Sequence, residues 1–339
     1  MKPIALRLFG VPALLVALLV VATGCGGASD EPTSSGQSSG SADGGQTISL
    51  VAYSTPEVVY DEIIADFAKT PDGKGIQFKE SYGGSGEQSR AVAAGLKADV
   101  VAFSLAPDVT RLVDEGLVAA DWNTRHRDGL VSTSLVSFIV RKGNSKNIRS
   151  WDDLLKPDVE VVTGNPFTSG GAKWNILGAY AHGGLDYVSK LIKEHVRVQP
   201  KSAREALQAF TGGQGDVLIS YENEAILAQK KGQDVDYVTP DDTFLIENPI
   251  AVTKTASATA NTFVDFALSR EGQQRFAQWG YRPVDKEVLR ANASKFPEPK
   301  KVTTIADLGG WSKVDDALFD ADQGSVAKIE ETAGVSTAK

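Results

Sequence analysis

The chain is poor in the residues from which covalent cross-links and metal sites are built. Its 339 residues include one cysteine, Cys25, and three histidines. A single cysteine excludes a disulfide within the monomer. His126, His182 and His195 lack the close spacing of metal ligands, so we expect no metal site, no cofactor and no histidine-based catalytic site. A Gly-x-x-x-x-Gly-Lys loop is also missing, which argues against a bound nucleotide.

Basic residues are also scarce relative to acidic ones. The chain has 35 Lys and Arg against 43 Asp and Glu, a net charge of −8. Two of the basic residues and none of the acidic ones lie in the first 25 positions, so removal of that segment leaves −10. A net acidic body without a basic stripe argues against nucleic acid as a partner. A small anion is still a possible ligand, because neutral N–H groups can hold one.

Long hydrophobic runs are confined to the N-terminus. Lys2 and Arg7 precede an almost unbroken run of Ala, Leu and Val at 11–21, and the small residues 22–24 lead to Cys25. The run is too short for a membrane span and predicts a secretory signal at 1–25. The small residues before Cys25 resemble the lipobox of bacterial lipoproteins, which makes Cys25 the expected lipidation site. The alternative is a plain signal peptide with a chance cysteine.

Residues 26–46 are rich in Gly and Ser and contain almost nothing apolar to bury. They predict a flexible tether that spans roughly 25 Å on average. The remaining body of about 290 residues is long enough for one large domain or two ordinary ones.

Short apolar runs alternate with helical patterns through this body. Such alternation predicts an α/β fold in which helices cover a parallel sheet. The expected strands are 48–53, 76–82, 99–103, 135–141, 159–163, 216–220 and 244–252, and the expected helices are 57–69, 88–96, 108–115, 172–181, 185–194, 203–210, 222–230, 258–268 and 271–280, with a further helical segment from 313.

Three loops between a strand and a helix have the same chemical character. They are 53–56 (Tyr-Ser-Thr-Pro), 82–88 (Tyr-Gly-Gly-Ser-Gly-Glu-Gln) and 168–171 (Thr-Ser-Gly-Gly). Each offers hydroxyls and backbone N–H groups at the start of a helix, and none contains His or Cys. The first turn of a helix has unpaired N–H donors and a partial positive charge, and glycine lets an oxyanion approach them closely. The loops are therefore typical of an anion site and poorly suited to catalysis.

Six segments, in order, resemble the motif series of the sulfate/thiosulfate-binding proteins of ABC importers, and the resemblance extends from about 48 to about 324. They are Ser-Tyr-Gly-Gly-Ser-Gly-Glu-Gln, Ala-Asp-Val-Val, Val-Arg-Lys-Gly-Asn, Trp-Asp-Asp-Leu, Asn-Pro-Phe-Thr-Ser-Gly-Gly-Ala-Lys-Trp-Asn and Gly-Asp-Val-Leu-Ile-Ser-Tyr-Glu-Asn-Glu-Ala. The resemblance implies an α/β, two-lobed, periplasmic-binding-protein-like (type II) fold with two crossover strands.

The resemblance also implies which residues bind the ligand. Sulfate would be held by hydroxyl and N–H groups of Ser169, Gly170 and Gly171, by Ser85, and by the N–H of Ala203. Two positions depart from the family pattern. Tyr221 stands where many members have a Trp donor, and its hydroxyl could replace the indole N–H.

The second departure is Ser54, which takes the position of an Asp in the loop after the first strand. Ser54 stays among the expected ligand residues, although the role of its loop is less defined than that of the others. We expect Glu222 and Glu224 to face solvent or to cap their helix, and the five Trp residues to serve packing.

A site made only of donors suits sulfate, which is fully ionised at neutral pH and only accepts hydrogen bonds. Phosphate keeps a proton and needs an acceptor. Thiosulfate, molybdate and phosphate remain alternatives. Two further alternatives are a lipid-anchored hydrolase using Ser85 or Ser169, which lacks a nearby His base, and an adhesion or scaffold lipoprotein.

The resemblance predicts a lobe of 47–134 plus 248–339 and a second lobe of 135–247, with crossovers near 134–140 and 244–252. Sulfate would bridge the cleft and favour its closed form. The expected partners are the permease subunits of an ABC transporter, whose cytoplasmic ATPase drives import, and the membrane through the lipid anchor. We expect a monomer at the extracytoplasmic face of the cell membrane.

Overall fold

The computed structural model describes residues 46–124 and 126–338. The predicted signal at 1–25, the lipidation site Cys25 and the tether up to 45 lie outside the described residues. Residues 45–339 form one compact unit. Among the helices of the described part of the chain, none has the length and apolarity to cross a membrane.

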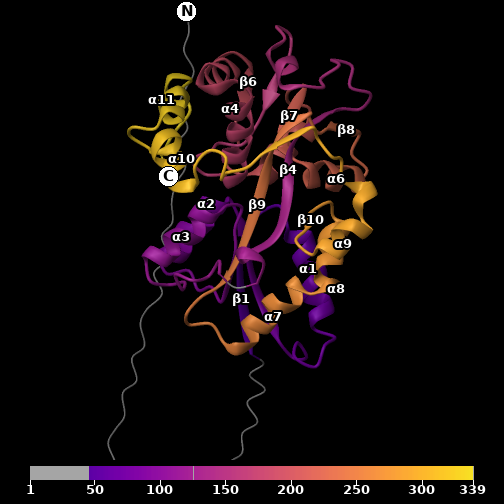
Figure 1. Ribbon diagram of the computed structural model, residues 1–339, viewed down its shortest axis with the longest axis vertical. Coiled ribbons are helices and arrows are strands. Elements are labelled where there is room, and N and C mark those ends of the chain that lie inside the picture. The colour runs from indigo at the N-terminus through magenta and orange to yellow at the C-terminus, as the bar shows by residue number, and fades with distance from the viewer. Residues whose placement is uncertain (1–45, 125, 339) are drawn as a thin grey trace, which may run out of the picture. The chain divides into compact units, whose positions relative to one another are not determined.

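Parallel strands build the first half of the sheet. Its order is β2 (Gln77–Gly83), β1 (Thr47–Tyr53) and β3 (Val100–Ala102), and all three run in one direction. The helices of this half are α1 (Glu57–Phe67), α2 (Ser85–Ala93), α3 (Ala106–Asp114), α7 (Ala258–Leu268) and α8 (Arg270–Gln278), which surround the lower part of the sheet in Figure 1. Because each strand is followed by a helix, the loops between them meet at the carboxyl ends of the strands.

The second half repeats this plan with β7 (Val217–Tyr221), β5 (Val161–Val162) and β6 (Val196–Val198), which are parallel to one another. Every residue of β7 is buried, as expected for a strand with both faces covered. Its helices are α4 (Gly170–Lys190), α5 (Ala203–Thr211) and α6 (Glu222–Lys230), with the turns η2 (Trp151–Leu155) and η3 (Leu191–His195). The expected helices 172–181 and 185–194 form α4 and η3, with a break at Gly184, whose φ is 68°.

Two long strands join the halves. Strand β9 (Asp242–Val252) pairs with β3 at Ile250–Val252 and with β4 (Leu130–Arg141) at Leu245–Pro249. Strand β4 pairs with β7 through Val136–Val140 and with the short strand β8 (Val235–Val238). All four pairings are antiparallel, so the sheet is mixed rather than parallel throughout, and this corrects the sequence-based expectation. The α/β fold with two crossover strands is confirmed.

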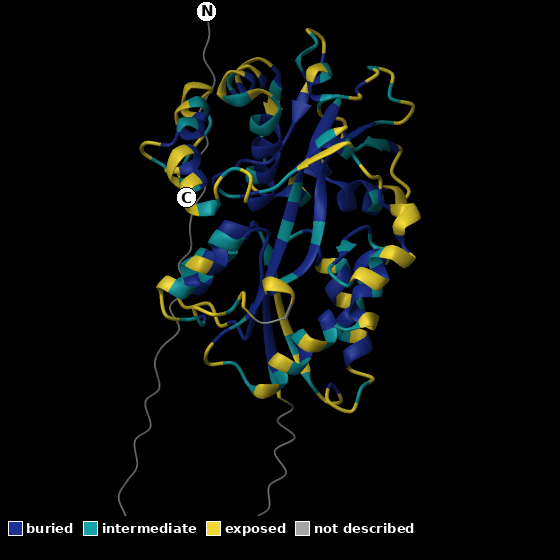
Figure 2. Ribbon diagram, in the orientation of Figure 1, coloured by how far each residue is buried: buried dark blue, intermediate teal, exposed yellow. Residues whose placement is uncertain are grey.

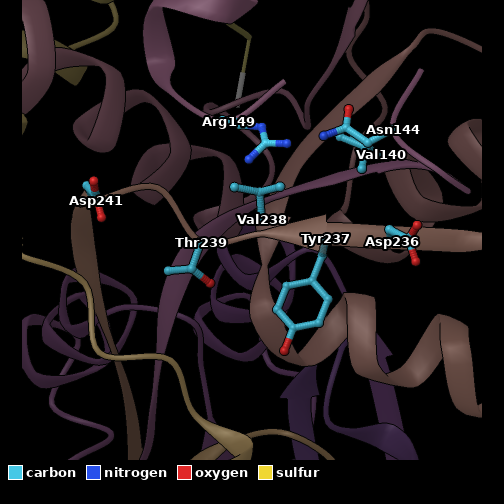
Figure 3. Close-up of a pocket in the computed structure, with 8 residues that line it drawn as sticks. All are labelled: Val140, Asn144, Arg149, Asp236, Tyr237, Val238, Thr239 and Asp241. Carbon is cyan, nitrogen blue, oxygen red and sulfur yellow. The ribbon is translucent and has the colours of Figure 1, made fainter. Parts of the chain in front are cut away.

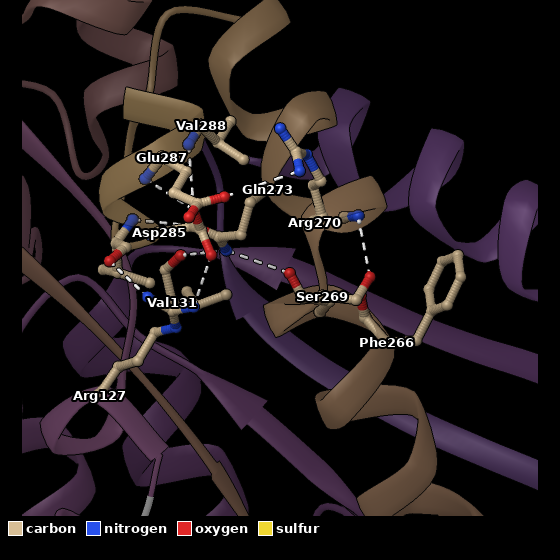
Figure 4. A network of polar contacts seen from close by, with 12 residues as sticks. Arg127, Val131, Phe266, Ser269, Arg270, Gln273, Asp285, Glu287 and Val288 are labelled. Carbon is tan, nitrogen blue, oxygen red and sulfur yellow. Dashed lines mark hydrogen bonds and ion pairs between the residues drawn. The ribbon is translucent and has the colours of Figure 1, made fainter. Parts of the chain in front are cut away.

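A buried glutamine fastens the start of β4 to helices far along the chain. The Gln273 side-chain amide donates to the carbonyls of Val131 and Ala267, and its oxygen accepts from the N–H groups of Val284 and Asp285 (Figure 4). All its hydrogen-bonding groups are thereby used, so this side chain holds together β4, α8 and the start of α9 (Lys286–Ala291) and has no unpaired polar atom.

The C-terminal segment leaves the first half of the sheet. After β10 (Arg282–Pro283), α9 (Lys286–Ala291) and η4 (Ala293–Lys295), strand β11 (Lys301–Thr303) pairs with the start of β9. Then α10 (Trp311–Val314), η5 (Asp315–Phe319) and α11 (Ser325–Thr332) follow, and α11 packs on α4 and η3 (Figure 1). Burial follows the same layers, with the sheet and the inner face of α4 buried (Figure 2).

Candidate functional site

Three helix N-termini meet at one small cavity. Ser85 is the first residue of α2, Gly171 the second of α4 and Ala203 the first of α5. The cavity between the loops is lined by Tyr53, Ser54, Gly83, Gly84, Ser85, Ser104, Ser169, Gly171, Ser202 and Ala203. No lining side chain carries a charge, and the polar groups are hydroxyls and backbone N–H groups.

The helix ends give this neutral cavity a positive potential. Helix α2 has no side-chain cap in the described structure, and the cap of α4 is weak, since Ser169 Oγ lies 3.4 Å from the Ala172 nitrogen. Unpaired N–H groups at the start of a helix carry its partial positive charge. Helix α5 is capped, because Ser202 Oγ accepts from the Glu205 N–H at 3.2 Å. Three helix N-termini around one cavity, two of them weakly capped or uncapped, make it suited to an anion.

The cavity is small and closed. Its volume is about 10 Å³, on a scale where one water needs about 10–15 Å³. A Cβ on Gly84, in the first half, would lie 2.8 Å from the Thr168 oxygen and 3.1 Å from the Lys201 oxygen, both in the second half. The loops of the two halves are therefore in contact here. The space as it stands holds about one water, so a ligand of several heavy atoms needs the loops to move apart.

The glycines at the start of α4 are required by packing. A Cβ on Gly170 would lie 2.8 Å from Leu105 Cδ2 and 2.9 Å from Ser104 Oγ, closer than real side chains approach. A Cβ on Gly171 would be 3.3 Å from Ala203 Cβ and from the Tyr221 hydroxyl. Gly170 itself does not line the cavity but lets α4 come close to the loop after β3.

Ser104 is a central residue that the sequence analysis missed. It is 1 % exposed and follows β3. Its hydroxyl lies 2.6 Å from the Tyr221 hydroxyl, its N–H donates to Ser85 Oγ, and its carbonyl accepts from Trp174 Nε1 and Asn248 Nδ2. The signal that could have found it is its position at the carboxyl end of a strand, directly before a helix.

Ser85 lines the cavity, but its hydroxyl is engaged elsewhere. Ser85 Oγ donates to Asp108 Oδ2 at 2.6 Å, and the other carboxylate oxygen of Asp108 pairs with Arg111 at 3.0 Å. Asp108 is itself buried. The sequence predicted Ser85 Oγ as a ligand donor, whereas in the structure this hydroxyl donates its proton to Asp108. The backbone N–H groups at the start of α2 have no side-chain cap.

Tyr221 is fully buried at the start of α6 and does not line the cavity. Its hydroxyl reaches Ser104, and burial raises the pKa of the phenol, so the group stays neutral. Tyr53, which does line the cavity, lies with its ring centroid 6.4 Å from that of Tyr221. The buried Tyr53 hydroxyl has no hydrogen-bond partner among the described residues.

Glu222 and Glu224 are fully buried, which corrects the expectation that they face solvent or cap the helix. Glu222 forms a two-point ion pair with Arg282. Glu224 lies 3.2 Å from Arg204 Nη2, outside hydrogen-bond geometry, and burial raises the pKa of its carboxyl group. Arg204 Nη2 also donates to the Thr55 carbonyl at 2.7 Å, which links α5 to the loop after β1.

Three larger cavities lie away from the predicted residues. One, of about 450 Å³, follows the edge of β8, where Asp236, Tyr237 and Asp241 come from one side and Asn144 and Arg149 from the other (Figure 3). The second, of about 510 Å³, lies between the end of β9 and α7. The third, of about 670 Å³, lies between η3, β6 and the end of α11. None of the three joins helix N-termini. In the described residues, no group of His, Cys, Asp and Glu side chains has metal-binding geometry.

The comparison with protein families places the chain in a known class. Residues 48–282 match the family of bacterial extracellular solute-binding proteins, and the chain belongs to this family. A sulfate-binding protein from Synechococcus elongatus is 40 % identical over 94 % of this chain and 95 % of the relative. A sulfate-binding protein from Escherichia coli is 36 % identical over 79 % of this chain and 88 % of the relative. A thiosulfate-binding protein from Pseudomonas aeruginosa is 35 % identical over 83 % of this chain and 91 % of the relative.

Solved structures agree with the sequence relatives. The sulfate-binding protein SubI from Mycobacterium tuberculosis superposes with a TM-score of 0.79 at 48 % identity, covering 81 % of this chain and all of that one. A periplasmic thiamin-binding protein shares the fold, with a TM-score of 0.64 at 19 % identity, over 78 % of this chain and 92 % of that one. The resemblance to sulfate/thiosulfate-binding proteins is therefore confirmed.

Proposed function

We propose that the protein captures sulfate outside the cytoplasm and delivers it to an ABC permease for import. The observation that supports this most directly is the cavity at the N-termini of α2, α4 and α5, which offers hydroxyl and N–H donors and no charged side chain. Relatives at 36–40 % identity bear the name sulfate-binding protein.

The chemistry of the lining favours sulfate over phosphate. Fully ionised sulfate accepts hydrogen bonds at all four oxygens, and a cavity of donors satisfies them. Phosphate brings an O–H group that needs an acceptor. Asp108, the buried carboxylate that contacts Ser85, already accepts from the Ser85 hydroxyl and pairs with Arg111, and it does not line the cavity. An unmet buried hydrogen bond can cost several powers of ten in affinity.

We propose specific roles for the predicted residues. Ser169 would donate its hydroxyl, and Gly171 and Ala203 their backbone N–H groups. Gly170 does not line the cavity as it stands, and its N–H would reach the ligand only after the loops move. Ser85 would contribute its N–H while its hydroxyl holds Asp108. Ser54 lines the cavity and would close it from the loop after β1. Tyr221 would act through Ser104 rather than by direct contact.

The two halves of the sheet would act as lobes that close on the ligand. We propose boundaries of 47–134 plus 248–300 for the first lobe and 135–247 plus 301–339 for the second. The amendment follows from α11, which packs on α4 and η3. The close approach of Gly84 to the 168 and 201 loops would belong to the closed state, and a ligand between these loops would favour that state.

In the cell, the protein would be a monomer without catalytic activity, held at the extracytoplasmic face of the membrane by a lipid on Cys25. Its partners would be the permease subunits and their cytoplasmic ATPase. The relatives are solute-binding proteins, and the cavity contains no His or Cys that could serve as a base or nucleophile.

Thermal unfolding and calorimetry of the mature chain with sulfate, thiosulfate, molybdate and phosphate, at fixed ionic strength, test the proposal. Sulfate at about 1,000 times its dissociation constant should add roughly 4 kcal/mol to the free energy of unfolding, and phosphate should add nothing. Strong binding of thiosulfate alone would change the ligand assignment. The absence of binding to every oxyanion would refute the transport role.

A further inference from the structure

The C-terminal segment contacts the two loops of the second half that contribute to the proposed anion site. We define the C-terminal brace as residues 311–336, which include α10, η5 and α11, beside α4 in Figure 1. We propose that this brace positions the loops 165–173 and 199–203, and that a proton on Glu330 keeps it engaged. The inference rests on the proposed anion site and adds a positioning element to it.

The brace holds the first loop at several points. Ser336 offers its carbonyl to Asn165 Nδ2 at 2.9 Å. Asn165 in turn orders the loop, because its side-chain oxygen accepts from the Phe167 N–H and its carbonyl accepts from the Ser169 N–H. Asn165 therefore links Ser336 to Ser169, and a shift of Ser336 should move the Ser169 loop.

The start of α4 is fixed by charge and aromatic contacts. Lys173 Nζ forms an ion pair with Asp315 and lies 4.9 Å above the ring of Phe319. The rings of Trp174 and Trp311 meet edge to face with centroids 4.7 Å apart. These contacts set the direction in which the first turn of α4 presents its N–H groups.

The second loop is held by one buried contact. Gln199 Nε2 donates to Glu330 Oε1 at 2.8 Å, and Gln199 lies four residues before Ala203. The two loops are also joined directly, since the Asn165 N–H donates to the Pro200 carbonyl and Thr168 Oγ1 donates to the Lys201 carbonyl. Displacement of Gln199 would therefore disturb both loops.

Glu330 is fully buried, and its second oxygen, Oε2, has no partner among the described residues. A buried carboxylate with one unpaired oxygen is unfavourable in its ionised form, and burial raises the pKa of Glu330 to about 7. None of the charged or titratable groups on the packed elements forms an ion pair with Glu330 in the described structure. These groups are Lys173, Tyr180, His182, Asp186, Tyr187 and Lys190 on α4, Lys193, Glu194 and His195 on η3, Arg197 on β6, and Asp315 and Asp316 on η5.

Burial and the unpaired Oε2 oppose ionisation of Glu330, and they outweigh the hydrogen bond from Gln199, which favours the carboxylate. Ionisation of Glu330 should therefore loosen the packing of α11 on α4 and η3, and Gln199 would lose its partner as α11 moves. The test is hydrogen–deuterium exchange of the full mature chain without ligand at pH 5.5 and pH 8.5, together with calorimetric sulfate binding at both pH values. The variants are Glu330→Gln, which mimics the protonated acid, and the matched control Glu331→Gln, which removes an exposed carboxylate one residue further along α11.

At pH 5.5, where Glu330 of the folded protein is largely protonated, the exchange of the two loops should differ less between the three proteins than at pH 8.5. At pH 8.5 the wild type and Glu331→Gln should exchange on the order of fivefold faster in these loops than Glu330→Gln, and bind sulfate about fivefold more weakly. Peptides covering 100–112 should not differ. If Glu330→Gln does not fold, the wild type alone provides the test. Its rate of loop exchange, divided by the rate of peptides 100–112, should be higher at pH 8.5 than at pH 5.5.

The two hypotheses fail in different ways. Equal loop exchange in wild type and Glu330→Gln at both pH values would overturn the brace, whether or not sulfate binds. Absence of sulfate binding by every protein, with the expected difference in exchange, would refute the proposed function and leave the brace intact.

Discussion

At the residue scale, the absence of charged side chains from the cavity wall determines which ligands it can bind. Its lining consists of serines, glycines, one alanine and one tyrosine, and the nearest carboxylates are turned away and paired. Small side chains bring the backbone N–H groups within reach of a ligand. A single acidic side chain in this wall would oppose an anion directly.

Ser169→Asp should abolish oxyanion binding, with a loss of at least about 100-fold in affinity, because it places a carboxylate in the cavity. Ser169 is the N-cap of α4, and Asp is as good an N-cap as Ser, so the melting temperature should stay close to that of the wild type. Calorimetry and thermal unfolding measure the two effects separately.

Ser169→Asn is the matched control, since it keeps the cap and the size of the Asp side chain without its charge. It should weaken binding much less than Ser169→Asp. Sulfate affinity that is unchanged in Ser169→Asp would remove this loop from the site.

At the element scale, the first turn of α6 connects the two halves of the sheet. Tyr221 reaches Ser104 after β3, Glu222 reaches Arg282 on β10, and Asn223 accepts from Ser134 on β4. Tyr221, the N-cap of α6, and the first two helix residues are all buried. The turn therefore lies at the junction where the lobes would move relative to one another.

Arg282→Met should lower the free energy of unfolding by about 3 kcal/mol, because it leaves Glu222 buried without its partner. The matched control is Arg270→Met. The Arg270 side chain is 69 % exposed and lies 3.6 Å from Glu287, so its loss should cost no more than about 0.5 kcal/mol. Urea denaturation of both variants measures the difference, and equal costs would contradict the structural role of the buried pair.

At the scale of the whole molecule, Glu330 makes stability depend on pH. Its pKa rises from 4.5 to about 7 on folding, so the cost of ionising it is absent below pH 4.5 and complete above pH 7. The free energy of unfolding should therefore fall by up to about 3 kcal/mol from this group as the pH rises through that window. In Glu330→Gln this part of the slope should disappear. A wild-type slope that persists in the variant would assign it to other groups.

Membrane attachment is a second property of the whole molecule. Cys25→Ala should release the protein from the membrane fraction, because Cys25 is the only cysteine and the proposed lipid carrier. Fractionation of cells expressing the full chain measures this. Continued membrane association of the variant would refute the lipid anchor.

The sequence alone was sufficient for those features that depend on neighbours along the chain. Helix caps, glycine-rich helix starts and the alternation of strands and helices are local signals, and they predicted the loops around Ser54, Ser85, Ser169 and Ala203. Parallel strands bring such loops to one edge, and all four residues line one cavity.

Only the tertiary structure decided the contacts between distant segments. Ser104 meets Tyr221 across 117 positions, and Asn165 meets Ser336 across 171. A serine or glutamate looks the same in the sequence whether it faces solvent or a buried partner, which is why Glu222 and Glu224 were wrongly predicted to be exposed or capping and Asp108 was not recognised. Their environment is created by packing, because burial and pairing depend on which segments the fold brings together, and no local pattern encodes that choice.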